Sequence, residues 1–100
     1  MTTTYEVQGI KVRSGVAPFL VNSEHIVSLC GVVQGSGQSW CFPMQEVLLH
    51  LLKGDVFFTS VPGAGPALVH RDGNNNWVTT VPDRTTKNNL LSLPHTCNCG

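Results

Sequence analysis

The chain has 100 residues and a mass of 10.8 kDa, a length typical of one small domain. Its hydrophobic content of 41% can supply a core, which argues against intrinsic disorder. Six Lys and Arg residues balance six Asp and Glu residues. This balance argues against a protein that binds extended nucleic acid and against a cationic membrane-surface helix. No apolar stretch reaches the roughly 18 residues of a membrane span, and residues 1–6 lack the pattern of a secretory signal, so we expect a cytoplasmic protein.

Two β-strands are predicted in the N-terminal third of the chain. Residues 5–13 alternate apolar and polar side chains, which is the period of a half-buried strand. Residues 16–21 form a connection or short edge segment, because Pro18 cannot donate to a strand ladder. Residues 25–33 are rich in β-branched side chains and predict the second strand. The Gly- and Ser-rich residues 34–39 predict a flexible loop.

A helix is predicted over residues 43–53. Proline at its start and glycine just after its end are typical of helix boundaries. Apolar residues recur at helical spacing and form one core-facing stripe: Met44, Val47, Leu48, Leu51 and Leu52. Leu49 lies on the polar face, where it is exposed or packs on a partner. His50 is expected to pair with Glu46, one turn earlier on that face.

Three further strands complete the predicted domain, over residues 55–61, 67–71 and 77–81. The order ββαβββ predicts an α+β fold in which an antiparallel sheet of about five strands carries one helix on one face. This single domain covers residues 1–100, with a core over residues 5–94 and a tail over residues 95–100.

The sparse charge of the chain predicts self-association. Charged residues make up 12% of the sequence, about half the usual share near 25%. A lone monomer with so little charge would be poorly protected from association. One helix also leaves the second face of the sheet to solvent or to an interface. We therefore expect a homo-oligomer.

Several motifs of the C-terminal half occur together in one known family. They are a tryptophan before a helix (Trp40), V-T-T-V-P-D at 78–83, and N-N-L-L-S-L-P at 88–94 followed by Cys97. In these motifs the chain resembles the family of short bacterial proteins called domain of unknown function number 3892. The resemblance spans roughly residues 5–97. It implies a compact α+β fold and brings no established reaction with it.

The four cysteines leave several states open: Cys30, Cys41, Cys97 and Cys99. Without a secretion signal, free thiols are the expected state, and Cys30 in its apolar run is predicted to be a buried structural thiol. The tail residues His95, Cys97 and Cys99 could join Cys41 or His25 around zinc. Structural zinc sites, however, favour about two to four residues between cysteines, and the tail has one. A tail disulfide and an inert terminus are the alternatives.

No arrangement of residues predicts catalysis. The sequence lacks a G-x-S-x-G elbow and a catalytic cysteine signature, and its acidic residues are scattered singly. His25 and His70 are flanked by apolar residues on predicted strands, where a histidine usually has a structural role. We therefore expect a non-catalytic protein without a cofactor.

A binding site for an anion is the better-supported prediction. The Gly- and Ser-rich loop leads to the start of the predicted helix, where backbone N–H groups favour an anion. Trp40 could stack on a planar ring, and Arg71 and residues 84–87 would supply cations and hydroxyls. The predicted ligand-binding residues are Gly35, Ser36, Gly37, Ser39, Trp40, Arg71, Arg84, Thr85, Thr86 and Lys87. The alternative is a merely flexible loop, with Trp40 covering the core and Trp77 packing across the sheet.

These residues predict a homo-oligomer that binds a small anionic, nucleotide-like ligand. Such a protein could be a sensor, or a sponge that sequesters a signalling nucleotide, as some small phage proteins do. Replacing Trp40 or Arg84 should then abolish binding without unfolding the chain. One alternative is a protein-interaction module that uses the open sheet face or an edge strand. A second alternative is a small zinc-binding module built on the Cys/His tail.

Overall fold

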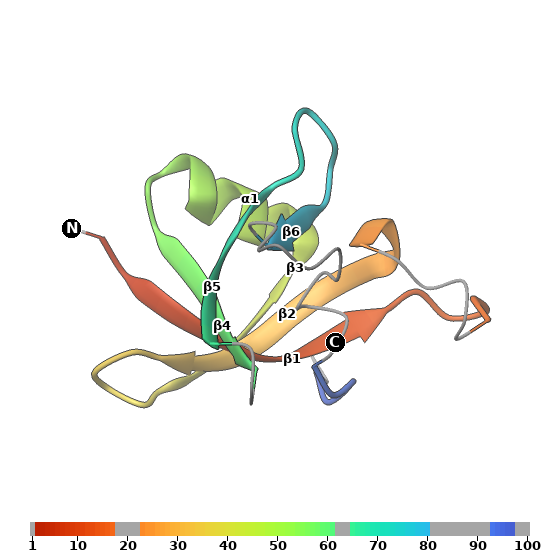
Figure 1. The fold of residues 1–100 in the computed structure, drawn as a ribbon. Helices are drawn as coiled ribbons and strands as arrows, with labels where there is room; N and C mark the ends of the chain where they lie inside the picture. Colours follow the sequence, from red (N-terminus) through yellow and green to blue (C-terminus); the bar gives the residue numbers. More distant parts are fainter. Residues whose placement is uncertain (1, 18–22, 62–64, 81–92, 98–100) are drawn as a thin grey trace.

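The computed structural model describes residues 2–17, 23–61, 65–80 and 93–97. In chain order their elements are β1 (Thr4–Val12), the 3-10 helix η2 (Ser23–His25), β2 (Ile26–Val33), β3 (Ser39–Pro43), α1 (Met44–Leu52), β4 (Val56–Val61), β5 (Gly65–Arg71) and β6 (Val78–Thr80). The strands form one six-stranded sheet in the order β3-β2-β1-β4-β5-β6, and α1 packs against it (Figure 1). The predicted α+β domain with one helix on the sheet is confirmed.

The sheet differs from the prediction by one additional strand, β3, and by one parallel pair. The predicted loop ends at residue 39 and the predicted helix begins at residue 43, so residues 40–42 belong to no predicted element, because five residues ending in proline give little strand pattern. They pair antiparallel with β2, and Trp40 lies opposite Gly31. In the centre of the sheet β1 and β4 run parallel, since β2, β3 and α1 intervene between them and no hairpin joins them.

The buried side chains form one cluster between the sheet and α1. Tyr5 and Val7 of β1 point into it, and a register shift between Val7 and Gly9 brings Ile10 to the same cluster. The C-terminal segment adds Leu93 to this cluster. Among the residues whose burial is described, the buried apolar ones are Tyr5, Val7, Ile10, Ile26, Leu29, Trp40, Met44, Val47, Phe57, Val69, Val78 and Leu93.

The helix is one residue shorter than predicted at each end, and its buried stripe is narrower. It ends before Gly54, whose φ of 98° confirms the left-handed position expected there. Met44 and Val47 are buried as predicted. Leu52 is 84% exposed, so the prediction that it belongs to the core-facing stripe is wrong. Leu52 lies in the last turn of α1 and faces a groove beside β5. No helix among the described residues has the length and apolar character needed to cross a membrane.

His50 pairs with Asp55, and the predicted pairing with Glu46 is wrong. His50 Nδ1 lies 2.8 Å from Asp55 Oδ2, and the backbone N–H of Thr3 donates to Asp55 Oδ1 at 3.1 Å. The His50 ring also stacks on Phe42, with ring centroids 4.5 Å apart. The hydrogen bond from His50, and then the one from Thr3, hold the pKa of Asp55 below its ordinary value. Asp55 therefore links the end of α1 to the start of β1.

We expect Asp55→Asn to lower the free energy of unfolding by about 1.5–3 kcal/mol near pH 7, the usual range for a hydrogen bond to a charged group. Because folding lowers the pKa of Asp55, its contribution is present above the unfolded-state pKa of about 4 and is lost as pH falls through the folded-state pKa. Urea unfolding of both proteins should therefore show a difference that shrinks below about pH 4. A difference that grows on acidification would contradict this role.

Candidate binding groove

The predicted Gly/Ser loop is a hairpin turn between β2 and β3. Gly35 and Gly37 have φ angles of 97° and 71°, which glycine adopts without strain. The turn is closed by hydrogen bonds from Val33 N to Gln38 O and from Gly37 N to Val33 O, at 2.8 and 2.9 Å. The turn leads into β3, so the expectation that it opens the helix is wrong. These glycines and Ser36 lie on an exposed turn, Ser39 begins β3, and this strand separates the turn from α1.

Trp40 is part of the core. Its side chain is 8% exposed, and its ring lies 5.3 Å from Tyr5, 5.1 Å from Phe42 and 5.4 Å from Phe57, measured between centroids. Alternation along β3 turns Trp40 and Phe42 toward the helix-covered face of the sheet. In this position the ring has no open face on which a ligand could stack, so the structure favours the core role over the stacking role.

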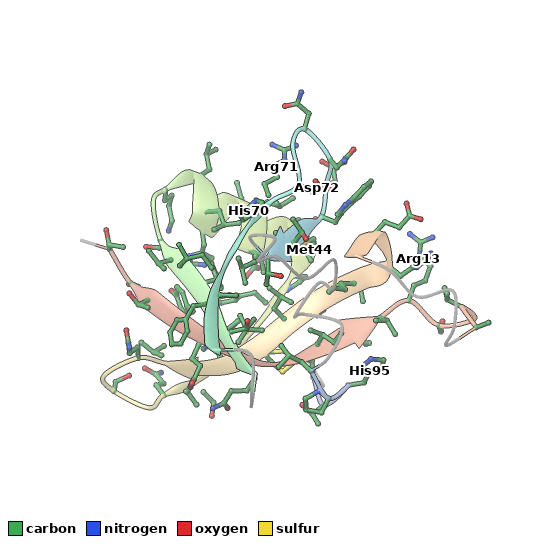
Figure 2. The ribbon with its side chains drawn as sticks, viewed as in Figure 1. Arg13, Met44, His70, Arg71, Asp72 and His95 are labelled. Atoms are coloured by element: carbon green, nitrogen blue, oxygen red, sulfur yellow. A yellow bond between two sulfur atoms is a disulfide. The ribbon has the colours of Figure 1, made fainter. Side chains whose placement is uncertain are left out.

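Arg71 is the one predicted cation of the site that the described residues include. Arg84, Thr85, Thr86 and Lys87 lie outside the described residues, so their expected approach to the Gly/Ser loop stays a prediction. Arg71 ends β5 on the side of the sheet that carries α1 (Figure 2). The structure therefore separates Arg71 from the Gly/Ser turn and places it beside the helix.

A groove of about 1030 Å³ runs between α1 and the end of β5. Its apolar lining consists of the helix residues Met44, Leu48, Leu49, Leu51 and Leu52. Its polar lining consists of Gln45, Glu46, His70, Arg71 and Asn76. Sites for small molecules commonly combine a concave apolar surface with a few well-placed polar groups. The groove has this composition, and Arg71 at the strand end is the arginine that its described lining contains.

Hydrogen bonds within the β5–β6 loop hold the Arg71 guanidinium in one orientation. Nε donates to the carbonyl oxygen of Asn75 at 2.6 Å, and Nη2 donates to Asn74 O at 3.1 Å and to Asn76 Oδ1 at 3.4 Å. A guanidinium has five N–H donors, and within the described ranges these bonds use only Nε and Nη2. The donors of Nη1 are therefore the ones that an anion in the groove could use.

Trp77 closes the same loop, and His70 borders it. The indole Nε1 of Trp77 donates to Asp72 Oδ2 at 2.9 Å, and the half-buried residue lies outside the core cluster. His70 Nδ1 lies 3.1 Å from the carbonyl oxygen of Arg71. Sequence reasoning missed His70 and Asn76 as groove residues. The run of three asparagines after Arg71, whose carbonyl and amide oxygens accept from the guanidinium, was the available signal.

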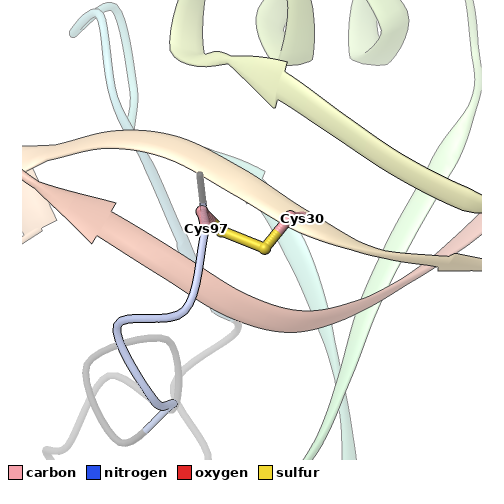
Figure 3. Close-up of a disulfide and its surroundings, with 2 residues drawn as sticks. All are labelled: Cys30 and Cys97. Atoms are coloured by element: carbon pink, nitrogen blue, oxygen red, sulfur yellow. A yellow bond between two sulfur atoms is a disulfide. The ribbon is translucent and has the colours of Figure 1, made fainter. Parts of the chain in front are cut away.

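Cys30 forms a disulfide with Cys97, so the prediction of a buried free thiol is wrong. The bond joins β2 to the C-terminal segment across 67 residues of sequence (Figure 3). The segment reaches β2 because it crosses β1, where Ile10 N donates to Pro94 O at 3.1 Å. Gly9 permits this crossing, since a Cβ there would collide with the Thr96 hydroxyl. Cys41 is also disulfide-bonded.

Comparison with known proteins assigns no function to this geometry. No protein-family model matches the chain, and neither a curated protein nor a solved structure matches it. The resemblance to domain of unknown function number 3892 stays a prediction carried by its sequence motifs.

Proposed function

We propose that this protein is a non-catalytic binding protein for a small anionic, nucleotide-like ligand held in the groove between α1 and β5. The observation that carries the proposal is the position of Arg71, a cation held by three hydrogen bonds at the edge of an apolar groove. A charge-assisted hydrogen bond from such a guanidinium to a phosphate is stronger than a neutral one. A sensor or sponge in the cytoplasm is the role we propose for such a binder.

The lining of the groove fits both halves of a nucleotide. The leucines of α1 offer an apolar surface for a base, while Nη1 of Arg71 can donate to a phosphate oxygen. Gln45 and Asn76 carry amides for the edge of a base, and the Glu46 carboxylate can accept from ribose hydroxyls. The volume of about 1030 Å³ lies just above the range of ordinary small-molecule pockets, about 300–1000 Å³.

Titration with adenosine 5′-monophosphate tests this proposal, with uncharged adenosine as the matched ligand. We expect the monophosphate to bind more tightly than adenosine, and Arg71→Gln to weaken its binding at least ~10-fold, since a hydrogen bond to a charged group contributes about 1.5–3 kcal/mol. Arg13→Gln is the control variant, because Arg13 is an exposed arginine outside the groove.

Equal affinity for adenosine and its monophosphate would contradict the role of Arg71, and so would unchanged binding by Arg71→Gln. Absence of binding by the wild-type chain would contradict the nucleotide-like ligand itself. Calorimetry reports the affinity and the stoichiometry in the same titration.

A second candidate function is association with a second copy of this chain through α1. Leu49 is 60% exposed and Leu52 is 84% exposed, an unusual exposure for neighbouring leucines on one helix. Glu46 and Lys53 lie about two turns apart and flank Leu49. An antiparallel pairing of two such helices about a two-fold axis would place Glu46 of each copy beside Lys53 of the other. Changes at these leucines would then disrupt the dimer, and Arg71→Gln would leave it intact.

A further inference from the structure

Three cysteine sulfurs converge on the helix-free face of the sheet. The Sγ atoms of Cys30, Cys41 and Cys97 all lie within 4.8 Å of one another. Cys30 and Cys41 are direct partners in the β2–β3 register, and they alternate with the core residue Leu29 and with Phe42, which packs against the core. Their side chains therefore leave the sheet on the face opposite α1. The C-terminal segment adds Cys97 from a distant part of the chain.

We propose that the reduced form of this protein binds one zinc ion through the thiolates of Cys30, Cys41 and Cys97. A dithiol reductant opens the Cys30–Cys97 disulfide by supplying two electrons and two protons, and it becomes a disulfide itself. The disulfide of Cys41 is reduced in the same way. Each thiol then loses its proton as its sulfur binds the metal, because the thiolate is the ligand.

The arrangement of the backbone suits a tetrahedral zinc site. A Zn–S bond is about 2.3 Å long, so thiolates on one tetrahedral ion lie about 3.8 Å apart. Once the disulfide opens, the Cys30 and Cys97 sulfurs move apart to reach this spacing, while the Cys41 sulfur already lies within 4.8 Å of both. The β2–β3 pairing holds two of them in register, and Gly9 leaves room for the segment that carries the third. Thiolate ligands favour zinc over magnesium and calcium.

This set of ligands differs from the tail site that the sequence suggests. Among the described residues, the only group of potential metal ligands that meets this spacing contains the three cysteines. His25 and His95 are described residues and do not belong to it. The short C-x-C spacing of the tail is no obstacle here, because two of the ligands come from neighbouring strands. Cys99 lies outside the described residues.

The test is a cobalt titration of the full chain, reduced with dithiothreitol and desalted without oxygen. We expect a thiolate-to-cobalt charge-transfer band that saturates at one ion per chain and disappears when zinc displaces cobalt. Native mass spectrometry should then show the mass of one zinc ion. Cys41→Ser should bind zinc at least ~10-fold more weakly, since loss of an outer-shell partner alone commonly costs about 10- to 100-fold. His95→Ala should bind zinc as the wild type does.

Absence of the charge-transfer band in the reduced wild type would overturn the site, and so would unchanged zinc affinity in Cys41→Ser. If the reduced chain unfolds without metal, far-UV circular dichroism measures whether zinc restores its secondary structure. Refolding on addition of zinc supports the site, while a chain that stays unfolded with zinc present overturns it. The metal readouts are independent of adenosine monophosphate binding, so failure here and failure of the groove proposal are separate results.

Discussion

Replacing Cys30 by serine should lower the free energy of unfolding by about 4 kcal/mol. The Cys30–Cys97 disulfide spans 67 residues, and closing a loop of this length removes much of the conformational freedom of the unfolded chain. The chain-entropy estimate for such a loop is about 4 kcal/mol near 25 °C. Denaturant unfolding of wild type and variant, with a chelator present to exclude zinc, measures the difference.

Cys97→Ser is the matched control, because it removes the same bond from the other end. Both variants should lose the same free energy, and the double variant should lose no more than either one. Tests of this kind separate a shared interaction from two independent ones. A loss below about 1 kcal/mol in both single variants would show that the bond contributes little to the stability of the folded chain in solution.

Trp40→Ala should lower the free energy of unfolding by about 3–5 kcal/mol, the usual cost of removing a large aromatic side chain from a core. The Trp40 ring contacts Tyr5, Phe42 and Phe57, and alanine would leave a cavity among these three rings. Trp40→Phe should cost much less, because phenylalanine keeps an aromatic ring at this place. The indole Nε1 also makes no hydrogen bond to the described residues, so its loss breaks none there.

Thermal or denaturant unfolding distinguishes the two Trp40 variants. Equal stability of Trp40→Ala and wild type would contradict the core position of this ring. The sequence suggested the opposite experiment, in which a Trp40 variant stays folded and loses only its ligand. Because Trp40 is buried, ligand-binding tests belong at Arg71, whose side chain is exposed.

Local patterns predicted the regular elements well. The alternation in β1 and the helical spacing from Met44 to Leu51 indicate which side chains are buried. In each element the period of the backbone decides which residues face the core. The glycine after α1 was predictable because its backbone conformation is local. The strand β3 was not predicted. It has only five residues and directly follows a Gly/Ser turn, so its sequence shows no clear alternation.

Contacts between distant residues were beyond the reach of the sequence. The pairing of Cys30 with Cys97 depends on the C-terminal segment crossing β1 at Gly9, which no local pattern encodes. The groove likewise forms only because β5 ends beside α1, and this brings Arg71 to the leucines of the helix. The sequence predicted Arg71 as a ligand-binding cation but placed it in one site with the Gly/Ser turn. In the fold, that turn lies between β2 and β3, away from Arg71 at the end of β5.

The most direct test of the groove is a map of the backbone amide signals that move when adenosine 5′-monophosphate is added to the labelled protein in an NMR titration. We predict that the amides of Leu48, Leu51, Arg71 and Asn76 shift with increasing ligand, and that those of the turn at 34–38 do not, because the groove lies between α1 and the end of β5. Shifts confined to that turn, or none at saturating ligand, would contradict the proposed site.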